Sequence, residues 1–144
     1  MARQNFSFTV WERPAPQGSK KYVGTRRTAS GANIPLIVES SAYLPAWRKA
    51  VVEAVKQGMS DSGDNSVFDS AVKVEVTFYL TKPKSIRTEY PVKPPDIDKV
   101  CRSLLDGITY GGVWVDDSLV VSLVAHKRWA KGEPGAAVTI SAVN

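Results

Sequence analysis

The chain has 144 residues and a mass of 15.7 kDa, which is enough for one domain with a hydrophobic core of its own. Hydrophobic residues make up 43% and charged residues 23%, so the composition excludes extended disorder. A formal charge of +5 favours an anionic partner such as nucleic acid, and the single cysteine, Cys101, excludes an internal disulfide framework. There is no apolar run long enough to cross a bilayer and no signal-peptide pattern in the first residues, so we expect a cytoplasmic protein without a membrane partner.

The first half of the chain predicts a strand, a long basic loop, a second short strand and a helix. Residues 5–11 (NFSFTVW) alternate apolar and polar side chains, as in a strand with one buried face. Residues 12–35 are rich in Pro, Gly, Lys and Arg and predict a long loop with a short ribbon, and residues 34–40 (IPLIVES) predict the short strand. Apolar residues then recur at helical spacing, so we expect a helix from about Ser41 to Met59.

The second half predicts three strands and a second helix. Residues 71–80 (AVKVEVTFYL) alternate most regularly, and a Pro- and Lys-rich loop follows over residues 81–95. Apolar positions from Val100 to Ile108 mark one side of a helix that the glycines of TYGG end. Two more strands are expected at residues 118–129 and 136–143. We therefore expect one α+β domain over residues 1–144, with a mixed sheet of about five strands and two main helices.

Two aspartates, Asp96 and Asp98, follow Pro94 and Pro95 at the start of this second helix. A residue that precedes proline is biased towards extended backbone, and in extended chain residues two apart face the same side. The two carboxylates can therefore point at one place. The alternative is that one of them is an ordinary helix N-cap.

A second acidic pair, Asp116 and Asp117, follows an alternating apolar stretch. Adjacent residues in extended chain face opposite ways, so we expect only one of the two to meet Asp96 and Asp98. Three carboxylates close together repel by about 4 kcal/mol per pair at an effective dielectric of about 20, unless a cation joins them or a pKa rises. Oxygen ligands without His or Cys select Mg²⁺ or Mn²⁺. Spacing thus indicates a metal-dependent hydrolase, with a solvated turn as the alternative for the second pair.

Residues 95–129 (PDIDKVCRSLLDGITYGGVWVDDSLVVSLVAHKRW) resemble the signature of the RusA-like Holliday junction resolvases, small endonucleases of bacteria, prophages and phages. The resemblance implies that Asp96, Asp98 and Asp117 are catalytic and hold the metal, with Asp116 beside them. It also implies that Arg102, four positions after the second aspartate, is the essential basic residue. The best-known member has lysine at that position; arginine keeps the charge but does not serve as a proton donor.

The resemblance further implies Mg²⁺-dependent cleavage of four-way DNA junctions by a homodimer, with one nick per subunit, in a bacterial or phage-infected cell. Basic residues of the two loops are candidates for phosphate contacts, although each alone is also explained as a solvated charge. They are Lys20, Lys21, Arg26, Arg27, Lys82, Lys84, Arg87 and Lys93. The alternatives are a nuclease that acts on flaps or branched replication intermediates, and a junction-binding protein without catalysis. A decayed site should lack one of the three catalytic aspartates, and all three are present.

Overall fold

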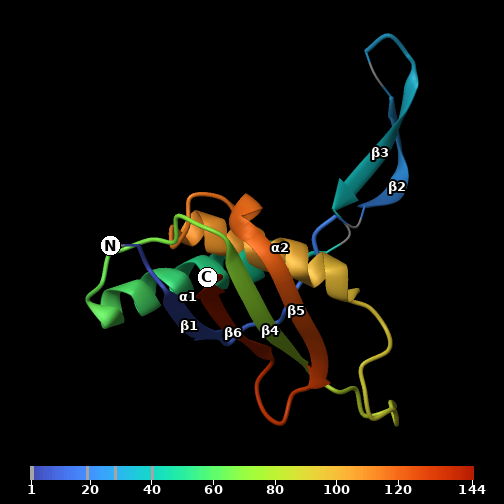
Figure 1. Ribbon diagram of the computed structural model, residues 1–144. Coiled ribbons are helices and arrows are strands. Elements are labelled where there is room, and N and C mark those ends of the chain that lie inside the picture. Colours follow the sequence, from blue (N-terminus) through green and yellow to red (C-terminus); the bar gives the residue numbers. More distant parts are fainter. Residues whose placement is uncertain (1, 19, 28, 40) are drawn as a thin grey trace.

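A four-stranded mixed sheet carries two helices on one face (Figure 1). The computed structural model describes residues 2–18, 20–27, 29–39 and 41–144, with side chains described for 2–18, 29–32 and 41–144. The strand order is β1-β6-β4-β5, in which β6 pairs antiparallel with β1 and β4, and β5 pairs parallel with β4. The bounds are β1 Asn5–Val10, β4 Val72–Leu80, β5 Val120–Trp129, β6 Gly135–Ala142, α1 Leu44–Ser62 and α2 Ile97–Gly111. This confirms the α+β class.

The number of strands in the sheet differs from the expected five. The strands β2 (Lys20–Arg27) and β3 (Asn33–Glu39) pair only with each other, as an antiparallel hairpin, so the main sheet has four. The short ribbon and short strand predicted in this region are therefore both present. The sequence KKYVGTRR carries four basic residues in eight and offers no continuous apolar face for a place in the core sheet.

The spacing of apolar residues along the sequence explains which side chains form the hydrophobic core. The buried side of β4 is formed by Val72, Val74, Val76 and Phe78, as its alternation predicts, and it packs under the apolar faces of α1 and α2. The helix α1 begins and ends three residues later than expected. Gly58 lies inside the helix, at a place where a Cβ would come within 2.8 Å of the Phe6 ring, so packing against Phe6 explains this glycine and it does not end the helix. The helix ends at Gly63, which has a φ of 65°.

Two glycines set the distance between the helices. A Cβ at Gly107 would lie 2.6 Å from Val51 Cγ1, and a Cβ at Gly111 would lie 2.6 Å from Val55 Cγ1. Both valines are fully buried, so α1 lies directly against the α2 backbone at these two positions, one helical turn apart. The close approach fixes α2 over the sheet, and with it the acidic residues of α2.

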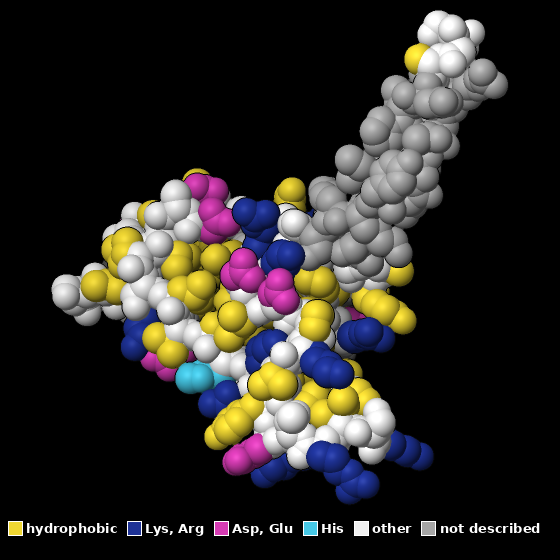
Figure 2. Space-filling model, turned by 90° about the vertical axis from the view of Figure 1, so that its right-hand side faces the viewer, with side chains coloured by type: hydrophobic (Ala, Val, Ile, Leu, Met, Phe, Trp, Pro, Cys, Tyr) yellow, Lys and Arg dark blue, Asp and Glu magenta, His cyan; other side chains and the backbone are white. Residues whose placement is uncertain are grey.

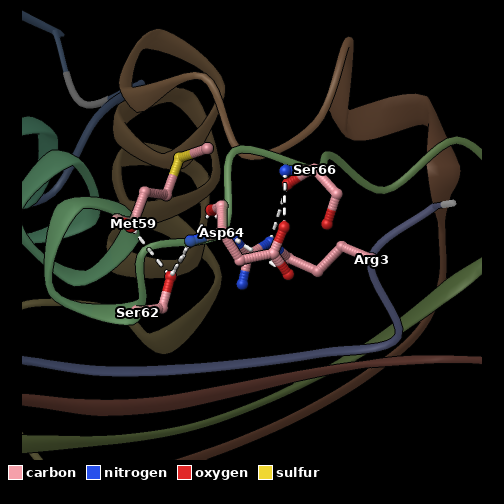
Figure 3. A network of polar contacts seen from close by, with 5 residues as sticks. All are labelled: Arg3, Met59, Ser62, Asp64 and Ser66. Carbon is pink, nitrogen blue, oxygen red and sulfur yellow. Dashed lines mark hydrogen bonds and ion pairs between the residues drawn. The ribbon is translucent and has the colours of Figure 1, made fainter.

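The connection from α1 to β4 is fastened by a buried arginine (Figure 3). Arg3 Nε donates to the Ser66 carbonyl at 2.8 Å, and Arg3 Nη2 donates to the Asp64 carbonyl at 2.5 Å. The Asp64 carboxylate accepts from the Ser66 backbone N–H, and the hydrogen bonds from Ser66 hold the pKa of Asp64 below its usual value. The guanidinium also lies 5.0 Å from the Phe6 ring centroid, which places β1 beside this connection.

Candidate active site

A groove of about 790 Å³ runs between α2 and the inner face of β5. Since β5 is the edge strand and α2 covers it only in part, Val121 and Leu123 remain 63% and 42% exposed. The groove has an apolar floor and three charged side chains, Asp98, Arg102 and Asp117. The apolar part is formed by Ile97, Cys101, Leu105, Val120, Val121, Leu123 and Ala125, together with Ser122. Two acidic residues that lie 19 positions apart in the sequence thus face one hollow.

The half-buried Asp117 carries negative charge that its surroundings do not favour. It opens a short 3₁₀ turn, η1 (Asp117–Leu119), which connects α2 to β5. Burial, and then the nearby charges of Asp116 and Asp106, raise the pKa of this carboxyl above its usual value. A carboxylate in such a place is stabilised by a bound cation or by protonation.

Its neighbour Asp116 faces different surroundings. The Asp116 side chain is exposed, does not line the groove, and accepts a hydrogen bond from the Ser118 backbone N–H at 3.3 Å. The hydrogen bonds from Ser118 lower the pKa of Asp116. Of the adjacent pair, only Asp117 lines the groove together with Asp98, and Asp96 is not among the lining residues, so the meeting of one member with both Asp96 and Asp98 stays a prediction.

The first pair, Asp96 and Asp98, is not arranged as an extended D-x-D. The helix begins at Ile97, so Asp98 has helical backbone in the first turn while Asp96 stays extended at the N-cap position. Asp96 makes no side-chain cap bond, and its carboxylate pairs with Lys99 Nζ at 3.4 Å. Within the described part of the chain, no three His, Cys, Asp or Glu side chains lie close enough together to hold one ion.

The exposed guanidinium of Arg102 lies against the backbone of Gly18. A Cβ at Gly18 would be 2.5 Å from Arg102 Nη1, and the φ of +91° at Gly18 already excludes most other residues. The ion pairs between described side chains involve Arg3, Lys49, Lys73 and Lys99, so Arg102 is not held by Asp98 or Asp106.

Residues 15–18 are held across α2 by buried polar contacts. Ser103 Oγ accepts from the Trp47 indole N–H at 2.9 Å and donates to the Ala15 carbonyl at 2.6 Å, and both Ser103 and Trp47 are fully buried. Gln17 donates its backbone N–H to the Lys99 carbonyl at 3.0 Å. These contacts bring the start of the β2–β3 hairpin beside Arg102.

Two site residues were missed by sequence reasoning. Asp106 accepts from Gln17 Nε2 at 2.5 Å and acts on Asp117 electrostatically, and Gln17 also accepts from Arg48 of α1. Lys127 Nζ donates to the Lys93 carbonyl at 3.1 Å and to the Pro95 carbonyl at 2.9 Å, and so fastens the segment before Asp96 to β5. The position of Asp106 four residues after Arg102 and eight after Asp98 on the same helix is a signal that could have found it, whereas no local pattern points to Lys127.

The proposed DNA-contacting residues fall into two groups. Lys82, Lys84, Arg87 and Lys93 are exposed on the 81–95 loop, and Figure 2 shows acidic side chains on one face of the molecule bordered by lysine and arginine side chains. The others belong to the hairpin, whose side chains lie outside the described ones. They are Lys20, Lys21, Arg26 and Arg27.

Comparison with known proteins identifies the family. In the described part of the chain, neither helix combines the length and the apolar character that a membrane span requires. A search of curated proteins gives no match. The model of the family described as "Endodeoxyribonuclease RusA" matches residues 14–141, which include both helices, the strands β4 and β5, nearly all of β6 and the residues that line the groove, whereas β1 lies before the match. The chain belongs to the RusA endodeoxyribonuclease family.

Proposed function

We propose that the protein is a Mg²⁺-dependent endonuclease that resolves four-way DNA junctions as a homodimer, with the groove between α2 and β5 as its active site. The observation that carries this proposal is the placement of Asp98 and Asp117, from two different elements, in one groove of a RusA-family chain. The function is the one that membership of the family suggests, and the metal is the one that the donor atoms suggest.

The residues present fit a hard divalent cation. Asp98 and Asp117 offer carboxylate oxygens. Burial, and then the charges of Asp116 and Asp106, raise the pKa of Asp117, and none of the ion pairs between described side chains includes it. We propose Asp96 as the third carboxylate ligand of the metal ion. Its ion pair with Lys99 is solvent-exposed and costs about 1 kcal/mol or less to break. When bound there, Mg²⁺ supplies Lewis acidity towards the scissile phosphodiester, with Mn²⁺ as a possible substitute.

The chain's own residues supply positioning and charge. Arg102 lies in the same groove, free of the acidic side chains on its own helix, so its guanidinium can neutralise charge that develops on the phosphate during attack. The lysines and arginine of the 81–95 loop can hold the flanking phosphates. The described residues form one such groove per chain, and two strands of a junction must be cut, so an isologous dimer is the simplest assembly.

Two neighbouring aspartates provide the test. Asp117→Asn should lower cleavage of a synthetic four-way junction by more than about 100-fold, while junction binding without Mg²⁺ stays equal or tightens because a negative charge is removed. Asp116→Asn, which changes the same charge outside the groove, should cleave within a few-fold of wild type. Flap and fork substrates in the same assay separate junction resolution from a broader structure-selective nuclease. Full Mg²⁺-dependent activity in Asp117→Asn would refute the assignment of the site.

A further inference from the structure

A second hollow, of about 560 Å³, lies between the 81–95 loop and the end of the sheet where β4 and β5 finish. Its volume is within the range of about 300–1,000 Å³ that is typical of small-molecule sites. The walls are mostly rings and aliphatic groups, contributed by Pro83, Ile86, Pro91, Pro94, Pro95 and Trp129. None of these residues lines the groove between α2 and β5.

The walls of this hollow are fixed by hydrogen bonds to the backbone. The Trp129 indole N–H donates to the Thr88 carbonyl at 2.9 Å, so its ring is tied to the loop opposite. Lys127 holds the carbonyls of Lys93 and Pro95. These bonds hold the residues that line the hollow in place, so a partner can bind there without first ordering the loop.

Charge and position identify the partner. Arg13 and Lys93 line the hollow, and Lys82, Lys84 and Arg87 are exposed on the same loop, so the rim attracts a polyanion rather than a neutral apolar peptide. Pro94 and Pro95 lead directly into Asp96 and the groove, so both sites can contact one DNA strand. Ring-lined pockets beside basic residues bind unstacked bases in single-stranded nucleic acid.

We propose that this hollow binds one unstacked nucleobase of the DNA strand whose phosphate lies in the α2–β5 groove, by stacking on Trp129 and the proline rings. The inference rests on the proposed nuclease function and adds a base-binding subsite to it. Stacking surfaces tolerate every base, so the subsite contributes affinity and alignment of the strand more than sequence readout.

The test uses the full chain in EDTA, with a fluorescent deoxythymidine octamer followed by anisotropy at several salt concentrations. Trp129→Leu should weaken binding by roughly tenfold, because one base loses its aromatic partner. The dependence on salt should stay unchanged, because no charge is removed. The matched control is Trp11→Leu, which removes a tryptophan that is 60% exposed and outside the hollow, and it should bind as wild type does.

A second variant protects the test against misfolding. Ile86→Trp fills the hollow from its rim and leaves Trp129 in place, and it should weaken octamer binding to a similar degree. Wild-type affinity in both variants would overturn the proposal and would leave the hollow to a peptide or a second copy of the chain. The readout involves neither Mg²⁺ nor cleavage, so its outcome does not depend on whether the nuclease assignment holds.

Discussion

Lys127 is expected to determine how readily the site takes up its metal. Its ammonium group donates to the carbonyls of Lys93 and Pro95, the two residues on either side of Pro94, and so holds the segment that carries Asp96. Lys127→Met keeps most of the side-chain volume and removes both bonds. The segment then loses its tie to β5, while the groove itself stays in place.

The size of the effect follows from the two bonds. A hydrogen bond to a charged group contributes about 1.5–3 kcal/mol, and the Lys93 bond is solvent-exposed, so it adds little to the partly buried Pro95 bond. The segment that carries Asp96 can be in a held arrangement, close to β5, or in a released arrangement, away from it. A loss of about 2 kcal/mol changes the ratio of the held to the released arrangement by roughly thirtyfold. Metal binding must restore the held arrangement, so the Mg²⁺ concentration for half-maximal cleavage should rise by up to about thirtyfold.

The assay is junction cleavage over a Mg²⁺ titration, with the melting temperature recorded beside it. Lys127→Met should recover most of its activity at high Mg²⁺, and Lys127→Arg, which can also donate to carbonyls, should lie near wild type. Lys131→Met, at an exposed position beyond the end of β5, is the matched control for loss of charge. An unchanged Mg²⁺ midpoint in Lys127→Met would refute the positioning role. A loss that Mg²⁺ does not restore, accompanied by weaker DNA binding, would indicate a phosphate contact instead.

Two further predictions concern the support of the groove. Ser103→Ala leaves the buried Trp47 indole N–H without its acceptor and should lower the free energy of unfolding by about 1–3 kcal/mol in urea, whereas Ser85→Ala, at an exposed position, should stay within about 0.5 kcal/mol. Burial, and then the charge of Asp98, raise the pKa of Cys101 from 9.0 to about 11. The pKa of Cys101 in the folded chain lies above its value in the unfolded chain, so the protonated thiol favours folding. This contribution to stability is complete below pH 9 and is lost as the pH rises through 11. The urea concentration at the midpoint of unfolding should therefore fall more between pH 8 and pH 10.5 for wild type than for Cys101→Ala.

The regular elements could be predicted because burial imposes a period on the sequence. The β4 strand alternates throughout, and α2 repeats its apolar residues at helical spacing, so both were found with nearly correct bounds. The β2–β3 hairpin was expected only as a short ribbon within a loop and a separate short strand after it, because strands outside the core sheet need no buried face and leave no strong alternation.

The candidate site could be predicted only in part, for a related reason. Local spacing pointed to Asp96, Asp98 and one member of the pair Asp116 and Asp117, and the resemblance to the RusA-like resolvases singled out Asp117 and Arg102. In the structure Asp117 lines the groove and Asp116 does not. The bond from Gln17 to Asp106 spans 89 positions, and that from Lys127 to Pro95 spans 32. Contacts of that range depend on how the sheet and helices pack, and no periodic pattern encodes them.

The separation of the three assigned carboxylates has an electrostatic explanation. Three such groups within about 4 Å of one another would carry about 4 kcal/mol of repulsion per pair at an effective dielectric of about 20. The Asp96 carboxylate pairs with Lys99, and Asp98 lies on the first turn of a helix, so neither is placed directly against Asp117 as a third member of one cluster. Asp117, which is half-buried near Asp106, has no described basic partner, and its pKa rises. A divalent ion bound by these carboxylates would offset the repulsion between them, which is the electrostatic reason why a metal suits this set of residues.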